Sequence, residues 1–446
     1  MNVQLAGQLM LAYATATLLL VANAARPLRR PAPLALASFF AGWLTNELAL
    51  LHLLAIALVT ALGAIAGGLG HWTGWLALPV MAFSAYRLWS LQLEAERTVD
   101  HVGTALQAAP AEPQRFVFPW PLRPADVEVV RNVPYAWSHR RQRLDVYRHR
   151  SRPTKAPAFL YVHGGAWVIG NKRQQGLMTV HRLAQQGFVC FSINYRLAPM
   201  GTFPEPLIDV KRAIAWIRRH GAEFGADPER IYIGGGSAGA HLSMLAALTP
   251  NDTELQPGFE SIDTRVHGVV AYYGVYDLLN REKQWPHYAG VRRLWRYAVI
   301  KRCPTKDPGS WRSASPIDRL HPGAPPMLLV HGEYDTLAPA ADARLFVEEA
   351  RRIGVSRAIL LELPRAQHAF EIFPSTRSRA VVDGVAQFVS GLVREHGEGL
   401  TSSLPSHRLL DRPTPAIDAQ QLTVNVGELH EAGRLRRHGH GRSPQQ

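Results

Sequence analysis

The sequence predicts a mostly parallel, doubly wound α/β sheet preceded by transmembrane helices. Short apolar runs rich in β-branched residues alternate with amphipathic helical segments, and several of these runs end in glycine or a polar residue. Residues 1–93, by contrast, carry few charges and long apolar stretches. The 446 residues leave room for an α/β domain of about 250 to 300 residues and one further region.

We expect residues 1–94 to form a membrane domain with about three transmembrane helices. Residues 5–24 carry no charge and are long enough to cross a hydrocarbon core of about 30 Å. Residues 48–69 and 75–93 are the other candidate spans, and residues 34–44 form a shorter apolar piece, so two or four spans are alternatives. Residues 22–24 also resemble a signal-peptide cleavage site, but no Lys or Arg precedes the first run and more apolar spans follow it.

The charges next to the first span predict its orientation. Arg26, Arg29 and Arg30 follow it directly, and the positive-inside rule places such a loop in the cytoplasm. Three spans would then make the chain a multi-pass membrane protein whose α/β domain is cytoplasmic, whereas a fourth span would reverse this orientation.

The rest of the chain divides into three regions. Residues 95–124 form a Pro-rich connector that we expect to be extended. Residues 125–397 form the α/β domain, with expected helices at 174–186 and 206–220 and expected strands at 127–130, 143–147, 158–162, 188–193, 231–233, 269–273, 327–330 and 359–363. Residues 398–446 are rich in Pro, Ser, Gly, Gln, Arg and His, which predicts a disordered basic tail.

An insertion near residues 279–311 contains several Trp, Tyr, Arg and Lys residues. One interpretation is a cap over a substrate pocket that also rests on anionic lipid headgroups. The alternative is a solvated helical excursion.

The strand at 231–233 leads into Gly235-Gly236-Ser237-Ala238-Gly239, which fits the pattern G-x-S-x-G. A serine on a sharp turn between a strand and a helix needs small neighbours, because its backbone is strained and crowded. We therefore identify Ser237 as the candidate nucleophile.

Two later strands supply the partners that such a serine needs. The strand at 327–330 precedes Asp335, and the strand at 359–363 precedes His368. The order Ser237, Asp335, His368 is the order of acid and base in α/β-hydrolase triads. Asp277 and Glu333 are rival acids, although Asp277 follows an earlier strand.

Consecutive glycines after the strand at 158–162 leave backbone N–H groups unobstructed, as an oxyanion hole requires. We expect Gly164, Gly165 and Ala238 to be the donors. Trp167 either lines the substrate pocket or packs beneath this loop. His241 lies four residues after Ser237 on the same helix, so we expect it to be packed away from the hydroxyl.

The chain resembles the hormone-sensitive-lipase-like branch of the α/β-hydrolases, the bacterial esterase/lipase group called α/β-hydrolase fold-3. The resemblance extends over residues 125–397 and is carried by the motifs at 163–167, 194–199, 203–204 and 235–239, with Asp335 and His368. It implies that His163 supports the oxyanion loop. Ala166 stands where the family has a third glycine and Gly236 where it has an acidic residue, features shared with formamidase-like and feruloyl-esterase-like members.

These observations predict a membrane-anchored serine carboxylic-ester hydrolase, an esterase or lipase that acts on acyl-ester or lipid substrates. Acyl transfer, cleavage of an amide such as an aryl formamide, and a catalytically silent membrane scaffold are the alternatives. The mechanism needs no cofactor, and no metal-ligand spacing is present. The net charge of +14 is spread over scattered arginines, which favours a membrane rather than nucleic acid as partner. Cys190 and Cys303 give no disulfide framework.

Overall fold

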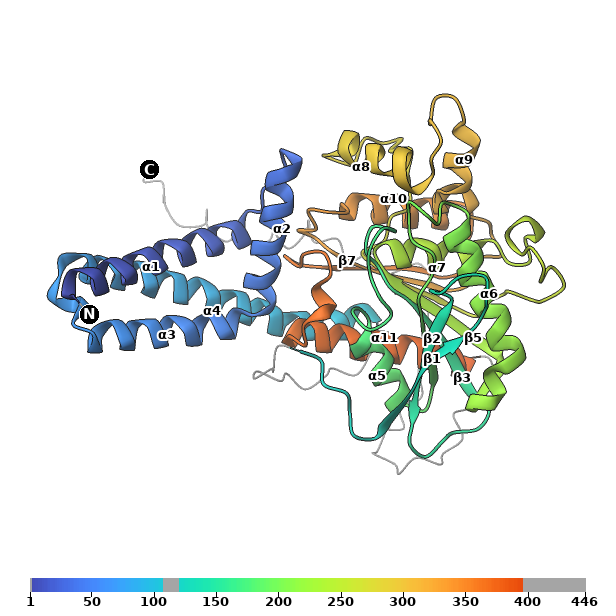
Figure 1. Ribbon diagram of the computed structural model, residues 1–446, viewed down its shortest axis with the longest axis horizontal. Coiled ribbons are helices and arrows are strands. Elements are labelled where there is room, and N and C mark those ends of the chain that lie inside the picture. The colour runs from blue at the N-terminus through green and yellow to red at the C-terminus, as the bar shows by residue number, and fades with distance from the viewer. Residues whose placement is uncertain (1, 107–119, 396–446) are drawn as a thin grey trace, which may run out of the picture. The chain divides into compact units, whose positions relative to one another are not determined.

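The computed structural model describes residues 2–106 and 120–395, all within one unit that ends at Leu404. Its centre is an eight-stranded sheet with the order β1-β2-β4-β3-β5-β6-β7-β8 (Figure 1). β1 and β2 pair antiparallel, and β3 to β8 run parallel, so the expected α/β sheet is confirmed. The strands are β1 Val127–Pro134, β2 Arg143–His149, β3 Ala156–Val162, β4 Val189–Ile193, β5 Ala226–Gly236, β6 Val269–Tyr272, β7 Met327–Gly332 and β8 Ala358–Leu363.

Alternate residues of each central strand enter two different cores, because successive side chains of a strand point to opposite faces. In β3, Leu160 packs in the core that includes α6 (Glu205–His220), α7 (Ala238–Leu248) and α10 (Ala340–Arg352). Phe159 and Tyr161 pack in the core that includes α5 (Leu177–Gln185) and α11 (Thr376–Glu395). Helices therefore cover both faces of the sheet.

Four helices precede the sheet: α1 (Val3–Ala25), α2 (Ala32–Glu47), α3 (Ala49–Ile65) and α4 (Trp72–Leu106). Among the described residues, α1 alone is long and apolar enough to cross a membrane by itself. The helical stretches Pro33–Glu47 and Ala49–Ile65 pass the same test only as a pair, and they are bent by 84°. The expected span at 75–93 lies in α4, whose Trp, Tyr, Ser and Gln residues and Arg87 lower its hydropathy. The described residues thus offer one or two candidate spans, fewer than the three expected.

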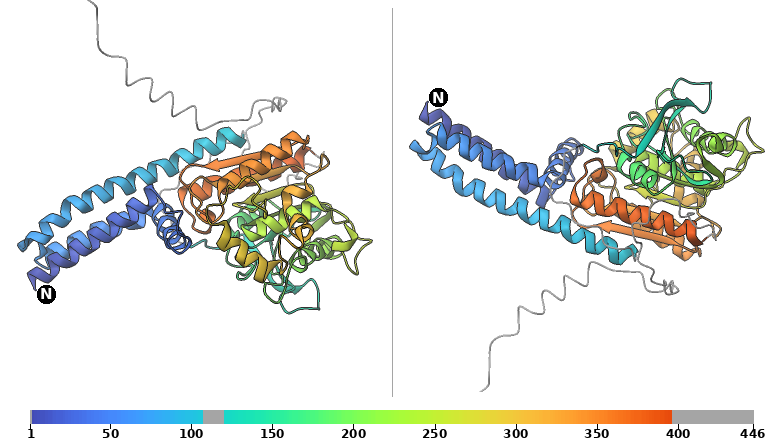
Figure 2. Two further views of the ribbon diagram at one scale, coloured as in Figure 1. Left: turned by 90° about the horizontal axis from the view of Figure 1, so that it is seen from above. Right: turned by 90° about the horizontal axis from the view of Figure 1, so that it is seen from below.

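The second half of α4 belongs to the packing of the α/β domain (Figure 2). Val99 and Val102 are buried, and a Cβ at Gly384 of α11 would lie 2.4 Å from Val102 Cγ1. The two helices can approach this closely only because Gly384 has no side chain. Residues 95–106 of the expected extended connector are therefore helical, whereas 107–119 and the expected tail at 398–446 lie outside the described residues.

The insertion near 279–311 contains α8 (Tyr288–Leu294), a π-helical turn (Trp295–Val299) and most of α9 (Pro308–Ser313). Its three tryptophans are buried, and Trp295 makes edge contacts with both Trp285 and Trp311. Tyr297 is exposed at 62%. The tryptophans therefore hold the insertion against the core, which favours the interpretation as a packed excursion over contact with headgroups.

Candidate active site

Ser237 lies at the turn between β5 and α7, with φ of 54° and ψ of −120°. A positive φ is rare for a residue with a side chain, and such strain is typical of functional turns. Cβ atoms at Gly235 and Gly239 would lie 2.5 and 2.0 Å from the carbonyl oxygen of Val162 in the neighbouring strand. Glycine is thus required on both sides of the serine, for the reason that the sequence pattern implies.

The structure brings Asp335 and His368 together. His368 Nδ1 donates to Asp335 Oδ2 at 2.6 Å, and both side chains are buried. Asp335 Oδ1 accepts the backbone N–H groups of Leu337 and Ala338, each at 2.8 Å. Burial opposes ionisation of Asp335, but the charge of His368 and hydrogen bonds from His331 and His368 hold the pKa of this carboxyl well below its usual range.

The rival acids lie in other hydrogen-bond networks. The buried Asp277 carboxylate accepts the backbone N–H groups of Leu279 and Arg281. Glu333 Oε2 accepts the N–H of Arg365. Neither carboxylate has a hydrogen bond to a histidine among the described residues, so the geometry favours Asp335 as the acid.

The oxyanion loop differs from the expectation at one position. The N–H of Gly164 donates to Gln175 Oε1 at 2.6 Å, so this expected donor is already occupied. The N–H groups of Gly165 and Ala166 have no acceptor in the described part of the chain, and Ala166 has φ of 50°. Ala238 occupies the first position of α7, where a helix leaves its N–H groups free. The available donors are therefore Gly165, Ala166 and Ala238, and sequence reasoning missed Ala166.

His163 is buried beneath this loop. Its Nδ1 contacts Gly164 O at 2.7 Å, Arg141 lies 3.3 Å from its Nε2, and its ring stacks on Tyr195. Burial lowers the pKa of His163 to about 4, so the ring is neutral near pH 7. These contacts are those of a loop support.

Trp167 packs inward rather than lining an open pocket. It is 4% exposed, and its Nε1 donates to His241 Nδ1 at 3.2 Å. His241 Nε2 bonds in turn to Ala314 O. The prediction that His241 is packed away from the hydroxyl is confirmed, and the Trp167–His241 pair ties the oxyanion loop to α7.

Two aromatic groups near His368 and Asp335 were not anticipated from the sequence. The Tyr273 ring lies 4.4 Å from the His368 ring, centroid to centroid. His331 Nε2 bonds to Ala338 O at 2.9 Å and lies 3.3 Å from Asp335 Oδ2. Both residues belong to buried strand ends, where apolar sequence runs do not reveal which side chains converge.

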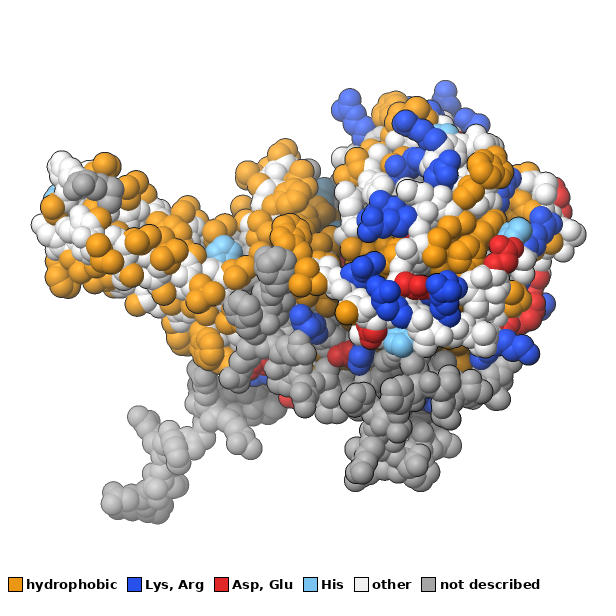
Figure 3. Space-filling view, turned by 60° about the horizontal axis from the view of Figure 1, so that its bottom comes forward, with side chains coloured by type: hydrophobic (Ala, Val, Ile, Leu, Met, Phe, Trp, Pro, Cys, Tyr) orange, Lys and Arg blue, Asp and Glu red, His pale blue; other side chains and the backbone are white. Residues whose placement is uncertain are grey.

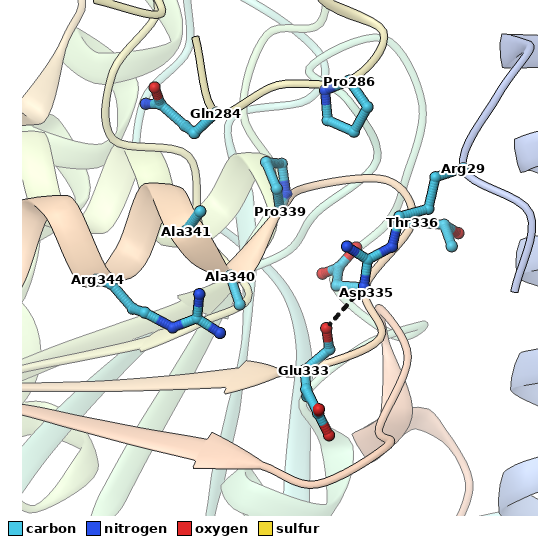
Figure 4. A pocket seen from close by; sticks show the side chains of 10 residues that line it. All are labelled: Arg29, Gln284, Pro286, Glu333, Asp335, Thr336, Pro339, Ala340, Ala341 and Arg344. Carbon is cyan, nitrogen blue, oxygen red and sulfur yellow. Dashed lines mark hydrogen bonds between the residues drawn. The ribbon is translucent and has the colours of Figure 1, made fainter. Parts of the chain in front are cut away.

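Asp335 also lines a pocket (Figure 4). Arg29, from the link between α1 and α2, reaches into it and donates from Nη2 to Glu333 O at 3.2 Å. Arg344 of α10 also lines it. The N-terminal region thus contacts the loop that carries the candidate acid.

Glu371, three residues after His368, is 1% exposed. Its carboxylate oxygens have no hydrogen-bond partner of standard geometry among the described residues, and burial outweighs the nearby Tyr273 hydroxyl and raises the pKa of Glu371 to about 7. The unfolded chain would ionise near 4.5, so this carboxyl makes stability fall as the pH rises from about 4.5 to 7.

The free energy of unfolding of Glu371→Gln, relative to that of the parent, is therefore expected to rise by up to about 3 kcal/mol between pH 4.5 and pH 8. Thermal unfolding in detergent across this pH range measures the effect. Glu254→Gln, at an exposed carboxylate, is the matched control and should show no such trend. A difference for Glu371→Gln that does not grow with pH would contradict the burial argument.

Comparison with known proteins finds similarity to esterases over this region. The BD-FAE family model matches residues 144–349, which include β2 to β7, Ser237 and Asp335. The chain also resembles a solved esterase from the planctomycete Thermogutta terrifontis with butyrate bound, at 25% identity and a TM-score of 0.50, over 62% of this chain and 96% of that one. A carbohydrate esterase from gut microbiota shares the fold, at 23% identity and a TM-score of 0.51, over 63% of this chain and 99% of that one.

Two of the curated relatives come from a mycobacterium. Esterase LipQ of Mycobacterium tuberculosis is 42% identical over 260 residues, which are 58% of this chain and 61% of LipQ. Esterase LipC of the same organism is 41% identical over 259 residues, 58% of this chain and 64% of LipC. The chain spans about three fifths of the length of these curated relatives. The similarities support the resemblance to an esterase family that the motifs predict.

Proposed function

We propose that this protein is a membrane-anchored serine carboxylic-ester hydrolase that cleaves acyl esters with Ser237, His368 and Asp335. The strongest support is the 2.6 Å contact between His368 Nδ1 and Asp335 Oδ2. Asp335 and His368 follow the C-terminal ends of β7 and β8, and Ser237 follows that of β5. Because these strands are parallel, all three residues lie at one edge of the sheet.

The geometry suggests a chemical role for each of these residues. Ser237 attacks the ester carbonyl while His368 Nε2 takes its proton, since an unassisted hydroxyl is a weak nucleophile near neutral pH. Asp335 holds the Nδ1–H tautomer and stabilises the imidazolium. The backbone N–H groups of Gly165, Ala166 and Ala238 stabilise the negative charge that develops on the carbonyl oxygen. A single donor of this kind raises kcat by about 10²–10³-fold. His368 then protonates the leaving alcohol, and water releases the acyl group.

The membrane part of the proposal is supported by the surface of the N-terminal helices. Large apolar side chains are exposed along α1 and α3, among them Leu9, Leu19, Leu58 and Ile65 (Figure 3). Such a continuous apolar surface is costly in water and suits a bilayer. We propose that these helices lie in the membrane as a multi-pass anchor, with Arg26, Arg29 and Arg30 on the cytoplasmic side next to the catalytic domain.

Hydrolysis of p-nitrophenyl esters from C2 to C16 by detergent-solubilised full-length protein tests the proposal. We expect turnover, and we expect a fluorophosphonate probe to label Ser237. The chain-length profile separates an esterase from a lipase, and product analysis with added alcohol separates hydrolysis from acyl transfer. Folded protein that neither turns over any ester nor reacts with the probe would refute the hydrolase proposal.

A further inference from the structure

One face of α2 rests on the segment that carries His368. The positions on this face are spaced by three and four residues, the spacing of a single helix face. Each of them has a partner within residues 365–377. The contacting positions of α2 are Phe39, Gly42, Trp43, Asn46 and Glu47.

The centre of this contact is Phe39. It is 5% exposed, and its ring meets the His368 ring edge-on at 6.2 Å between centroids, with 77° between the planes. Trp43 stacks behind it at 5.5 Å, and Trp43 Nε1 donates to the carbonyl oxygen of Ala369 at 3.0 Å. Phe39 is thus held by a residue that is itself bonded to the neighbour of His368.

The end of α2 fixes the same segment more firmly. Asn46 Nδ2 donates to Arg365 O at 3.2 Å. Glu47 accepts from Arg377 Nη1 at 2.7 Å and from the Ser375 hydroxyl. Glu47 and Arg377 are buried, so their pairing has little competition from water. The contacts bracket His368 from both sides in sequence.

Gly42 allows α2 to lie this close. A Cβ at this position would be 3.3 Å from Gln367 Nε2 and 3.2 Å from Asn23 Nδ2. The opposite face of α2 points away from the segment, with Leu34 50% and Leu44 38% exposed. One face of α2 therefore packs against residues 365–377 and the other is exposed, so substitutions on the exposed face can serve as controls.

We propose that Phe39 is a positioning residue for His368, so that the N-terminal helices set the geometry of the catalytic base as well as anchoring the chain. This inference rests on the proposed function. By itself, the hydrogen bond to Asp335 fixes the His368 imidazole at Nδ1 only and leaves the ring free to rotate about that bond. The rings of Tyr273 and Phe39 restrict that rotation and keep Nε2 aimed at the serine.

The test compares Phe39→Ala with Leu34→Ala, on the same helix but on its exposed face, in detergent-solubilised full-length protein. We expect Phe39→Ala to lower kcat for p-nitrophenyl butyrate about 10- to 100-fold, because small misplacements of catalytic groups have effects of this size. KM should stay within about 2-fold, and the pH profile of kcat should shift. Leu34→Ala should change kcat less than about 2-fold. Phe39→Leu, which keeps an apolar contact, should recover part of the loss.

A second measurement does not depend on activity. His368 is 7% exposed, and removing the Phe39 ring opens it to solvent. Its modification by diethyl pyrocarbonate, quantified by peptide mass spectrometry, should become several-fold faster in Phe39→Ala and stay unchanged in Leu34→Ala. Thermal unfolding shows whether each variant is folded. Trp43→Phe, which removes the bond to Ala369 and keeps a smaller aromatic ring next to Phe39, provides a milder second variant with the same expected direction.

Unchanged kcat and unchanged modification in folded Phe39→Ala would overturn the inference. A change in KM alone would also overturn it, because it would make Phe39 a binding-site wall. Failure of the proposed function has a different signature, since the parent protein itself would then neither hydrolyse esters nor react with fluorophosphonate, while the modification rate of His368 would still report on its contact with Phe39.

Discussion

Replacement of Ser237 by alanine is expected to lower kcat for p-nitrophenyl ester hydrolysis by a factor on the order of 10⁶. The hydroxyl is the atom that forms the acyl-enzyme, and no other side chain can take its place at the turn between β5 and α7. The residual rate should come from the oxyanion amides and substrate binding alone. Steady-state kinetics with p-nitrophenyl butyrate measure the loss, and intact-mass analysis should show no fluorophosphonate adduct.

Ser243→Ala is the matched control for this variant. Ser243 lies six residues further along the same helix, is buried, and its hydroxyl has no hydrogen-bond partner in the described part of the chain. Its loss should leave kcat within about 2-fold, since it removes no satisfied bond. A Ser237→Ala protein with more than about one hundredth of the parent rate would contradict the nucleophile assignment.

The sheet and the order of candidate residues could be predicted because both depend on local signals. Each of Ser237, Asp335 and His368 follows a buried apolar strand of the parallel part of the sheet. Parallel strands bring their C-terminal ends to one edge, so knowing the strands was enough to place the residues there. A Cβ at Gly235 or Gly239 would clash with the carbonyl oxygen of Val162 in the neighbouring strand, so glycine is required at both positions.

The donors of the oxyanion loop depend on a longer-range contact. Gly164 and Gly165 look equivalent in sequence, yet only Gly164 meets the side chain of Gln175, eleven residues later. That bond depends on how the following loop folds back. A run of glycines therefore predicts that free amides exist there, but not which amides they are.

The surroundings of two segments also depend on packing between distant parts of the chain. The aromatic residues at 279–311 fitted both a cap and a packed helical excursion, and their tryptophans are buried in the core. Aromatic content alone cannot distinguish side chains that pack in the core from side chains that contact lipid headgroups, because both bury a large apolar surface. The helix that touches His368 is α2, more than 300 residues away in sequence, and no local pattern predicts such a pairing.

Replacement of Asp335 by asparagine is expected to lower kcat by about 10⁴-fold with the fold retained. The reason lies in the two oxygens of the carboxylate. Oδ1 accepts the N–H groups of Leu337 and Ala338, so an asparagine places its carbonyl oxygen there. Its NH₂ group then faces His368 Nδ1, which must become an acceptor, and the proton moves to Nε2. This tautomer cannot take the proton of Ser237.

Asp277→Asn separates this explanation from a general loss of buried charge. Asp277 is also fully buried and also accepts two backbone N–H groups, but its carboxylate has no hydrogen bond to a histidine within residues 2–106 and 120–395. Its folded variant should keep kcat within about 10-fold, even if the loss of its contact with Arg281 lowers the melting temperature. If Asp277→Asn instead lost more activity than Asp335→Asn in kinetics on folded protein, Asp277 would be the acid and the order of the proposed triad would have to be revised.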